Sequence, residues 1–548
     1  MVPLKSENAA RFNMIVLFAL MIASVRTMCR TTPEPPEENR VNCYMYESSD
    51  PVLWQEDDQI CDGDDEDDGE EEVEGHSVTK RSLGDFDDYM IQERPNRLHH
   101  RFNVLLNNSI LFFEAQKSGK IFRSHQKLYW RTSSCLGDRG FKEEDLTGGW
   151  YDAGDNVKFN FPMAFSTAVL AWSLIEFPDA YREAGAYDDM LDTIKWTCDY
   201  FIKCHTRPNE YYYQVADANV DHSNWQRPED IYYYRDPFRI QHNGTGSDVI
   251  GSTAAALATC AVAYSEAGMG GRATVYRKKA VDLYRVATNN IGKYPDNGYY
   301  INNNLGDELV WAATWLHIAT GELQYLEDAE AYFAEYKLRG RSYCFGWGDT
   351  REGSKLLLYK ITNKATYKDA FMNYMDTLLP FNSPHLYTPK GLFMRNEWGS
   401  LRYAAGATFV GLVGAKLGLR PKVYREFACN QTNYMLGDNI RRSFVIGYGV
   451  DPPCRPHHRA SSCPDLDTPC TNQNSWNNPG CNHHQLVGAM VGGPDANDEW
   501  TDNRKDYIHN EVACDYNAVF QATIAGLAQA DTERELPPAC FILSRRVG

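Results

Sequence analysis

Two acidic residues three positions apart lie in a glycine-bearing segment, Gly148-Gly149-Trp150-Tyr151-Asp152-Ala153-Gly154-Asp155. At this spacing the carboxylates of Asp152 and Asp155 can share one face of a turn and hold a single water molecule between them. Such an arrangement suits general-base catalysis. A calcium-ligating pair and a helix-capping pair are the alternatives, and spacing alone favours capping over catalysis.

A glutamate, Glu511, lies among acidic and aromatic residues just before an expected helix near the C-terminus. A carboxyl group packed against aromatic rings loses solvation, and this loss raises its pKa toward that of a useful proton donor. Glu511 is therefore the candidate general acid. The alternative is a charge that favours the N-terminus of the following helix, and composition does not separate the two interpretations.

Two adjacent histidines and an arginine stand in Pro456-His457-His458-Arg459, inside a loop rich in proline and cysteine. Metal ligation is one interpretation, but zinc sites take ligands at separated, matching spacings. We expect these side chains instead to bind hydroxyl groups or to orient a carboxylate.

Aromatic residues stand beside polar ones in Asp221-His222 with Trp225, and again where Glu229-Asp230 precedes Tyr232-Tyr233-Tyr234. Sugar-binding sites have this composition because C–H faces stack on rings while hydroxyl groups need paired donors and acceptors. Packing of the aromatic residues into the core is the alternative.

The elements that would position these residues are helices. After about residue 97, amphipathic segments alternate with long loops, no Gly/Ser or Pro linker interrupts them, and alternating β-branched runs are scarce. We therefore expect one all-α domain of about a dozen helices. Helical periodicity is clearest in 166–177, 190–205, 252–266, 308–318, 354–361, 401–417, 424–436 and 517–530.

Two long stretches, 437–486 and 488–510, carry little periodicity. Loops longer than about 12 to 15 residues are uncommon without a function, so we expect these stretches to form a cleft. They contain Cys454, Cys463, Cys470 and Cys481, and disulfides there would restrict an otherwise loose loop.

The charge of the chain argues against polyanionic partners. The formal net charge is −19, which disfavours nucleic acid and anionic membranes. Much of this charge lies in an acidic tract, 56–72, with too few apolar residues to fold. The aromatic content of 13% suits flat sugar faces.

The N-terminal region has the features of an export signal. Lys5 and Arg11 precede a short apolar run, 14–25, so we expect a signal peptide over 1–27, with an uncleaved anchor as the alternative. An acidic disordered segment would follow over 28–97. A cut after the dibasic pair ending at Arg81 would remove three of the 15 cysteines and leave an even set that begins at Cys135.

Taken together, these segments resemble glycoside hydrolase family 9, and in particular its animal-type endo-β-1,4-glucanases. The resemblance is colinear over about 113–527 and rests on order and spacing. It is carried by Gly149-Trp150-Tyr151-Asp152-Ala153-Gly154-Asp155, Asp221-His222 with Trp225, Arg227-Pro228-Glu229-Asp230, Gly246-Ser247-Asp248, Asp307-Glu308-Leu309, Trp398-Gly399-Ser400-Leu401-Arg402-Tyr403-Ala404, Leu436-Gly437-Asp438-Asn439, Pro456-His457-His458-Arg459 and Asn510-Glu511-Val512-Ala513.

The resemblance implies an (α/α)6 barrel over 98–548, with an open cleft at one end, and an inverting mechanism. Asp155 would be the general base, Asp152 would orient the water, and Glu511 would protonate the glycosidic oxygen. Inversion implies about 6.5 to 9.5 Å between acid and base carboxyl groups, which leaves room for the attacking water.

The resemblance also implies roles for further residues. His457 and Arg459 would bind the sugar beside the scissile bond, and Asp502 would position the proton donor. Substrate contacts are implied for His222 and Trp225 on the glycone side, for Tyr403 and Tyr516, and for Trp347 and Trp398 as stacking platforms.

Two departures concern a calcium site that relatives have. This chain has Trp347-Gly348-Asp349 where the family often has Trp-Asp, and Asn303-Asn304 where it has Ser-Gly. Calcium is therefore not required by the sequence, although Asp307, Glu308 and Asp349 keep enough oxygen atoms to bind it. The chain stops at Gly548 soon after the last helix, so we expect no carbohydrate-binding module and a preference for soluble or amorphous glucan.

These observations predict a secreted, monomeric endoglucanase that cleaves internal β-1,4 bonds by inversion, with no required cofactor, no nucleic-acid partner and no membrane contact after removal of the signal. One alternative is a hydrolase of another β-linked polysaccharide, such as mixed-linkage glucan, xyloglucan, glucomannan or a chitosan-type chain. The other is a carbohydrate-binding relative without activity.

Overall fold

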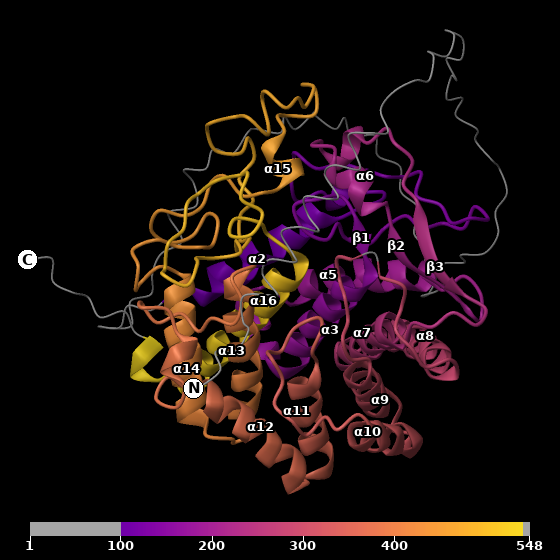
Figure 1. Cartoon of the computed structure of the whole chain (residues 1–548), viewed down its shortest axis with the longest axis vertical. Helices are drawn as coiled ribbons and strands as arrows, with labels where there is room; N and C mark the ends of the chain where they lie inside the picture. The colour runs from indigo at the N-terminus through magenta and orange to yellow at the C-terminus, as the bar shows by residue number, and fades with distance from the viewer. Residues whose placement is uncertain (1–99, 297, 541–548) are drawn as a thin grey trace, which may run out of the picture. The chain divides into compact units, whose positions relative to one another are not determined.

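The computed structural model describes residues 100–296 and 298–540. The expected signal peptide, the acidic segment and the cut after Arg81 lie outside the described residues. Within them, twelve long helices alternate along the chain between an inner and an outer position of a closed ring (Figure 1).

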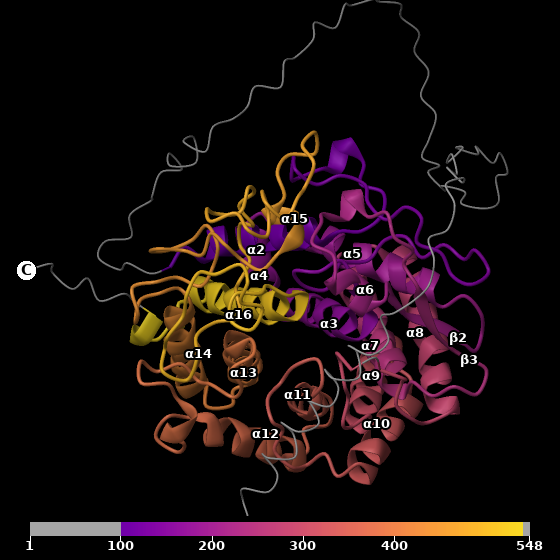
Figure 2. The same cartoon turned by 45° about the horizontal axis from the view of Figure 1, so that its top comes forward.

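The inner ring is formed by helices that are buried almost all round. Each packs against the next along the chain, and the last packs against the first, which closes the ring (Figure 2). These helices are α3 (Asn160–Glu176), α7 (Ser247–Glu266), α9 (Gly306–Thr320), α11 (Arg351–Thr362), α13 (Ser400–Lys416) and α16 (Cys514–Thr532).

Each outer helix covers one inner helix. The pairs are α5 on α3, α8 on α7, α10 on α9, α12 on α11, α14 on α13 and α2 on α16. The outer helices are α2 (Phe102–Gln116), α5 (Tyr187–Cys204), α8 (Gly270–Asn289), α10 (Leu323–Glu335), α12 (Ala365–Leu378) and α14 (Pro421–Met435). This alternation is the predicted (α/α)6 barrel, which is confirmed.

The burial of the inner helices explains their sequences. Helix α7 is apolar on every side and rich in small residues, as expected for a helix surrounded by protein. By length and composition it could cross a membrane, but 94% of its apolar window is buried inside the structure. In α13, a Cβ added at Gly406 would overlap the backbone oxygen of Phe345, so glycine allows the two segments to approach closely.

All eight helical segments predicted from periodicity are helices, and each differs from the prediction by a few residues at its ends. The remaining described helices are short: α4 (Pro178–Glu183), α6 (Ala218–His222) and α15 (Arg459–Ser462), with 3-10 turns η2 (Arg123–His125), η3 (Pro228–Asp230), η4 (Pro384–Leu386) and η5 (Pro538–Cys540).

A small antiparallel sheet departs from the purely helical expectation. Its strands are β1 (Lys158–Phe159), β2 (Glu210–Val215) and β3 (Pro237–Gln241), in the order β1-β2-β3. Lys158 pairs with Val215, and Tyr211 pairs with Ile240. Every residue of the tyrosine-rich β2 is buried, and aromatic residues favour strands in such surroundings. The sheet fixes the start of the long segment between β2 and α7.

The loops that precede the six inner helices meet at one end of the barrel. This follows from the alternation, because each outer helix carries the chain back and all inner helices therefore run in the same direction. The residues expected to be functional lie in these loops, so the barrel brings segments more than 350 residues apart to one rim.

Candidate active site

A cleft of about 630 Å³ opens at this rim, and every loop that precedes an inner helix contributes to it. Many of the residues expected from the sequence line it. These are Asp152, Asp155, His222, Trp225, Trp347, Trp398, His457, Arg459, Glu511 and Tyr516. The barrel thus brings the expected acid and base into one cleft.

Hydrogen bonds hold the loop of the Asp pair to the two other catalytic segments. The amide of Cys514 donates to the carbonyl of Asp152 at 2.9 Å, and the amide of Arg459 donates to the carbonyl of Gly154 at 2.9 Å. A Cβ added at Gly154 would overlap the backbone oxygen of His457. Glycine is therefore needed for this close approach of the two loops.

Glu511 is held by its backbone in the same junction. The amide of Gly492 donates to the carbonyl of Glu511, and the amide of His457 donates to the carbonyl of Asn510, both at 2.8 Å. The side chain is half-buried in the cleft, where its carboxyl group loses solvation, and this loss together with the nearby Asp155 charge raises the pKa of Glu511 to about 8. Glu511 is then protonated at neutral pH, as a general acid must be.

The pKa of Asp155 is shifted in the opposite direction from that of Glu511. Burial favours the neutral form of its carboxyl group, but the hydrogen bond and charge of His222 and the charge of Arg459 outweigh burial and lower the pKa of Asp155. His222 Nε2 lies 2.9 Å from Asp155 Oδ2. Since Asp155 stays ionised, it can accept a proton from water.

Asp152 is set apart from Asp155 by its surroundings. Burial and the neighbouring charge of Asp155 raise the pKa of Asp152, although the hydroxyl of Tyr300 donates a hydrogen bond to its Oδ2. Of the two aspartates, Asp155 therefore carries the negative charge, and Asp152 can help to orient a water. Titratable groups with diverging pKa values mark acid and base roles.

His457 is a neutral side chain in the cleft. Burial and the charge of Arg459 lower the pKa of His457 to about 4. Its Nδ1 lies 2.8 Å from the carbonyl of Arg504, so Nδ1 carries the proton and Nε2 can accept a hydrogen bond from a sugar hydroxyl. The rings of Trp225, Trp476 and Tyr507 surround it, with centroids at 4.9, 6.0 and 6.1 Å.

Arg459 lines the cleft, but most of its donors bind protein. Its Nη1 donates to the carbonyl of Gly154 at 3.1 Å, its Nε donates to the carbonyl of Asn224 at 3.0 Å, and its guanidinium lies over Trp225. The side chain joins the base loop to the segment that carries His222. We infer that it supports the cleft wall and sets its charge.

Asp502 does not line the cleft. Its carboxylate accepts hydrogen bonds from the amides of Cys454 at 2.8 Å and Arg455 at 3.0 Å, and from the side chain of Asn510 at 3.1 Å. Asp502 therefore reaches Glu511 only through its neighbour Asn510. Its geometry suits a positioning residue, not a group that touches substrate.

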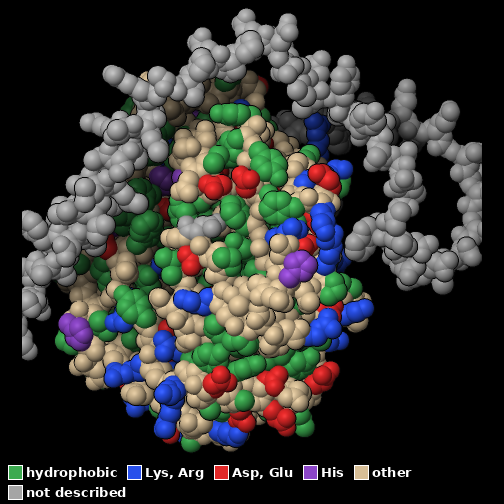
Figure 3. Space-filling view, turned by 45° about the vertical axis from the view of Figure 1, so that its right-hand side comes forward, with side chains coloured by type: hydrophobic (Ala, Val, Ile, Leu, Met, Phe, Trp, Pro, Cys, Tyr) green, Lys and Arg blue, Asp and Glu red, His purple; other side chains and the backbone are tan. Residues whose placement is uncertain are grey.

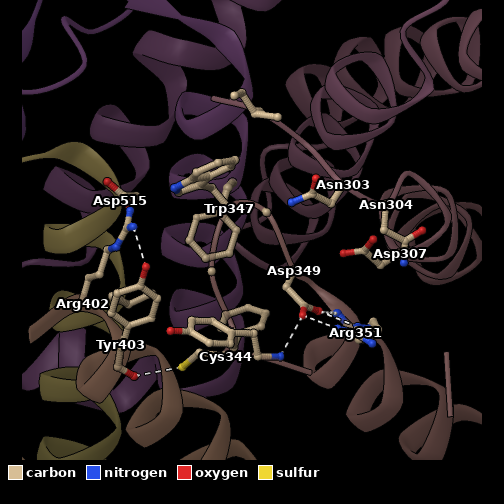
Figure 4. A pocket seen from close by; sticks show the side chains of 17 residues that line it. Asn303, Asn304, Asp307, Cys344, Trp347, Asp349, Arg351, Arg402, Tyr403 and Asp515 are labelled. Carbon is tan, nitrogen blue, oxygen red and sulfur yellow. Dashed lines mark hydrogen bonds and ion pairs between the residues drawn. The ribbon is translucent and has the colours of Figure 1, made fainter. Parts of the chain in front are cut away.

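The aromatic residues divide between two adjoining pockets. Trp398 is 46% exposed in the cleft, which leaves a ring face for stacking, and Tyr516 lines the cleft while remaining buried. Tyr403 instead lines a neighbouring pocket of about 390 Å³, and Trp347 borders both (Figure 4). Tyr403 is therefore displaced from the reacting groups.

The calcium candidates do not converge on one point. Arg351 binds the carboxylate of Asp349 through Nε at 2.8 Å and Nη2 at 2.5 Å (Figure 4). Oδ2 of Asp307 accepts from the amide of Thr350 at 2.8 Å. Glu308 is buried, and neither carboxylate oxygen has a partner within hydrogen-bond geometry. Among the described residues, the acidic and histidine ligand atoms that gather within 4.8 Å belong to another group, Asp155, Asp221 and His222. Asp307, Glu308 and Asp349 thus do not bring their ligand atoms within 4.8 Å of one another in this arrangement of the described residues.

Several residues of the site were missed from the sequence. Tyr300 donates to Asp152, Arg402 forms an ion pair with Asp515 at 3.1 Å, and Trp476 packs against Trp225. Tyr299, Tyr507, Arg402, Asp515, Trp476 and Tyr300 all line the cleft. The only sequence signal for these residues was that aromatic side chains stand in polar loops. The residues that they contact lie far away in the sequence, so the contacts could not be predicted.

Disulfides bracket the loop that carries His457 and Arg459. Cys454 pairs with Cys481, and Cys463 pairs with Cys470, so the four loop cysteines that were expected to form disulfides do so. Cys429 pairs with Cys540. The other six described cysteines, among them Cys135, are free thiols.

Known proteins share this sequence and fold. The family model described as glycosyl hydrolase family 9 matches residues 102–524. Endoglucanase A of Bacillus pumilus is 41% identical over 452 residues, which cover 78% of this chain and 66% of that protein. Endoglucanase 13 of Arabidopsis thaliana is 37% identical over 444 residues, which cover 74% of this chain and 89% of that protein.

A solved structure is also similar to this chain. The endoglucanase of the termite Nasutitermes takasagoensis has a TM-score of 0.77 and 44% identity to this chain, with 79% of this chain and 100% of that chain covered. The chain spans about two thirds of the length of the Bacillus relative and the full length of the termite structure.

Proposed function

The chain belongs to glycosyl hydrolase family 9, and we propose that it is an endoglucanase that cleaves internal β-1,4 bonds of glucan with inversion at the anomeric carbon. The observation that carries this proposal is that two carboxyl groups lining one cleft have pKa values shifted in opposite directions. The surroundings of Asp155 lower its pKa, whereas burial raises the pKa of Glu511 to about 8.

The two groups divide the reaction between them. Asp155 takes a proton from a water molecule that Asp152 helps to orient, and the oxygen of that water attacks the anomeric carbon. On the opposite side of the sugar, Glu511 gives its proton to the glycosidic oxygen as the bond to carbon breaks. The β-linkage is thereby replaced by an α-hydroxyl group, and general acid–base catalysis of this kind contributes about 10²- to 10⁴-fold.

Other side chains bind the polymer. The exposed ring of Trp398 and the border position of Trp347 suit stacking on sugar faces, and Nε2 of neutral His457 suits a hydroxyl group. The cleft is open at one end of the barrel, which favours attack within a chain. The steps above involve none of the calcium candidates Asp307, Glu308 and Asp349, which do not line the cleft.

The test is product analysis on a panel of β-linked polysaccharides, with the first anomer followed by NMR. Carboxymethylcellulose should yield reducing sugar and α-anomeric products. Glu511→Gln is the control and should release little. A β-anomer as first product would contradict inversion, and release only from mixed-linkage glucan, xyloglucan, glucomannan or chitosan would assign a different polymer.

We also propose that the protein is secreted and acts as a monomer. Disulfides persist in oxidising compartments, and three are present among the described residues. The chain has three Asn-x-Ser/Thr glycosylation sequons, at Asn107, Asn243 and Asn430. Asn243 and Asn430 are exposed, while the side-chain amide of Asn107 donates to the carbonyls of Asn103 and Ala184. Glycosidase digestion of secreted protein and size-exclusion chromatography test these points.

A further inference from the structure

Two tyrosines beside the cleft, Tyr232 and Tyr234, are 81% and 69% exposed. Single exposed rings are common on protein surfaces, and Tyr129 of this chain is 75% exposed, but Tyr232 and Tyr234 stand two residues apart on one segment. We propose that they form a binding platform for a β-glucan chain outside the cleft, which extends the site on the side of His222. The inference rests on the proposed function, because that function supplies the polymer.

Exposure alternates along the segment that carries these rings. Arg227, Glu229 and Arg235 turn inward, whereas Tyr232 and Tyr234 turn outward. The inward residues are firmly bound. Arg227 Nη1 donates to the carbonyl of Pro464 at 2.8 Å, Arg131 pairs with Glu229 at 2.7 Å, and Arg235 pairs with Asp138 at 2.8 Å.

This anchoring matters for binding. A segment fixed by three buried guanidinium groups presents its outward side chains in one arrangement, so little backbone freedom is lost when a ligand binds. Tyr232 is further oriented by an edge-to-face contact with Tyr233, with ring centroids 6.0 Å apart. The two exposed rings are therefore held on a rigid segment before a flat ligand binds.

The middle tyrosine connects the platform to the active site. The hydroxyl of Tyr233 donates to Oδ1 of Asp221 at 2.6 Å, and Oδ2 of Asp221 accepts from the amide of Asn156 at 3.2 Å. Asn156 follows the base Asp155, and His222 follows Asp221 and lines the cleft. The segment that carries the platform is thus bonded to the loop that carries the base and to the segment that carries His222, which is the reason to assign it the same polymer.

The chemistry of the surface favours a neutral sugar chain. The C–H faces of glucose stack on aromatic rings, and the phenolic hydroxyl groups can bond sugar hydroxyls. Asp236 beside the rings is exposed, whereas Arg227 is paired with Asp230 at 2.7 Å and Arg235 with Asp138, so the segment offers no unpaired cation to a polyanion. Figure 3 shows hydrophobic, acidic and basic side chains intermingled on this side of the molecule, without a large patch of one charge.

The experiment measures binding apart from hydrolysis. Glu511→Gln serves as the inactive background, and its retention by hydroxyethylcellulose in affinity electrophoresis is compared with that of Glu511→Gln carrying Tyr232→Ala and Tyr234→Ala. We expect about tenfold weaker retention of the double alanine variant. Tyr232→Phe with Tyr234→Phe keeps the rings and should bind nearly as well as the background. Tyr129→Ala is the matched control, since Tyr129 is 75% exposed in another segment.

Kinetics provide the second measurement. In the active chain, the double alanine variant should have a higher KM for long glucan and an unchanged kcat on the short oligosaccharide cellotetraose. Equal retention of the double alanine variant and its background would overturn the platform, as would an equal loss with Tyr129→Ala. Failure of the proposed function would differ, because the unmodified chain would then release no sugar from any β-glucan, and that result would end the platform as well.

Discussion

Nε2 of His222 lies 2.9 Å from Oδ2 of Asp155, although 67 residues separate the two in the chain. Family resemblance implied that His222 binds the glycone side of the substrate. The structure gives it a second contact, with the candidate base itself. The histidine and the carboxylate stabilise each other's charged forms, since the pKa of His222 is raised by Asp155 and the pKa of Asp155 is lowered by His222.

Replacement of His222 by asparagine should therefore move the acidic limb of the pH profile. Without the imidazole the pKa of Asp155 rises, so the base becomes protonated, and activity is lost, at a higher pH than in the unmodified chain. A hydrogen bond to a charged group is worth about 1.5–3 kcal/mol, which corresponds to about one pH unit or more. The measurement is kcat/KM against pH. His242→Asn, at an exposed turn, is the control, and an unmoved acidic limb would assign His222 to substrate binding alone.

The alkaline limb should report Glu511. Its pKa is raised to about 8, so the group is protonated below that pH and loses its proton above it, and the rate should fall as pH passes about 8. Glu511→Gln should lower turnover by about 10²- to 10⁴-fold with an unchanged circular dichroism spectrum. Asp155→Asn should cause a loss of similar size. A profile that stays flat to pH 10 would mean that another group donates the proton.

Gly154→Ala tests the junction between the two catalytic loops. The added methyl group would overlap the backbone oxygen of His457, so the loops must separate, at a cost of about 1–3 kcal/mol in the free energy of unfolding. Activity should fall more steeply than stability, because Asp155 and His457 lie on opposite sides of the contact. Gly137→Ala, where a Cβ meets no atom within 4 Å, should leave both unchanged. Urea unfolding and kcat measured on the same samples give the comparison.

Much of the barrel could be predicted from local pattern. Apolar spacing identified the six inner helices, which are apolar over many turns, and the outer helices α5 and α14, which bury one face. Strand β2 was missed because both of its faces are buried, so its tyrosines show no alternation. The candidate acid and base were predicted from motifs, because the order and spacing of the glycine and acidic residues there match those of the family.

Contacts between distant loops could not be predicted in this way. Tyr300 and Asp152 are 148 residues apart, and nothing near either residue indicates the other. The same holds for Asp502, which the family resemblance implied would position the proton donor. Its carboxylate binds the backbone amides of Cys454 and Arg455 and the side chain of Asn510, the neighbour of Glu511, and only the folded loop reveals these partners.

Removal of calcium should have no effect on stability. Since Arg351 holds the carboxylate of Asp349, we expect the same Tm in EDTA and in calcium chloride. Arg351→Met should lower the free energy of unfolding by about 1 kcal/mol or more, because a half-buried carboxylate loses its partner. Arg182→Met breaks an exposed pair with Asp179 and should change almost nothing. A rise in the Tm of the unmodified chain on addition of calcium would show that the acidic groups rearrange to bind it.

The common direction of the six inner helices separates two requirements on the sequence. Residues that close the ring must fit their neighbours on all sides, whereas the outward side chains of a rim loop, such as Tyr232 and Tyr234 between β2 and α7, have few neighbours. Changes at such outward positions should therefore alter the preferred polymer while the contacts that hold the acid and base remain. The barrel thus keeps the catalytic groups in place while substrate specificity varies at the outward positions of its loops.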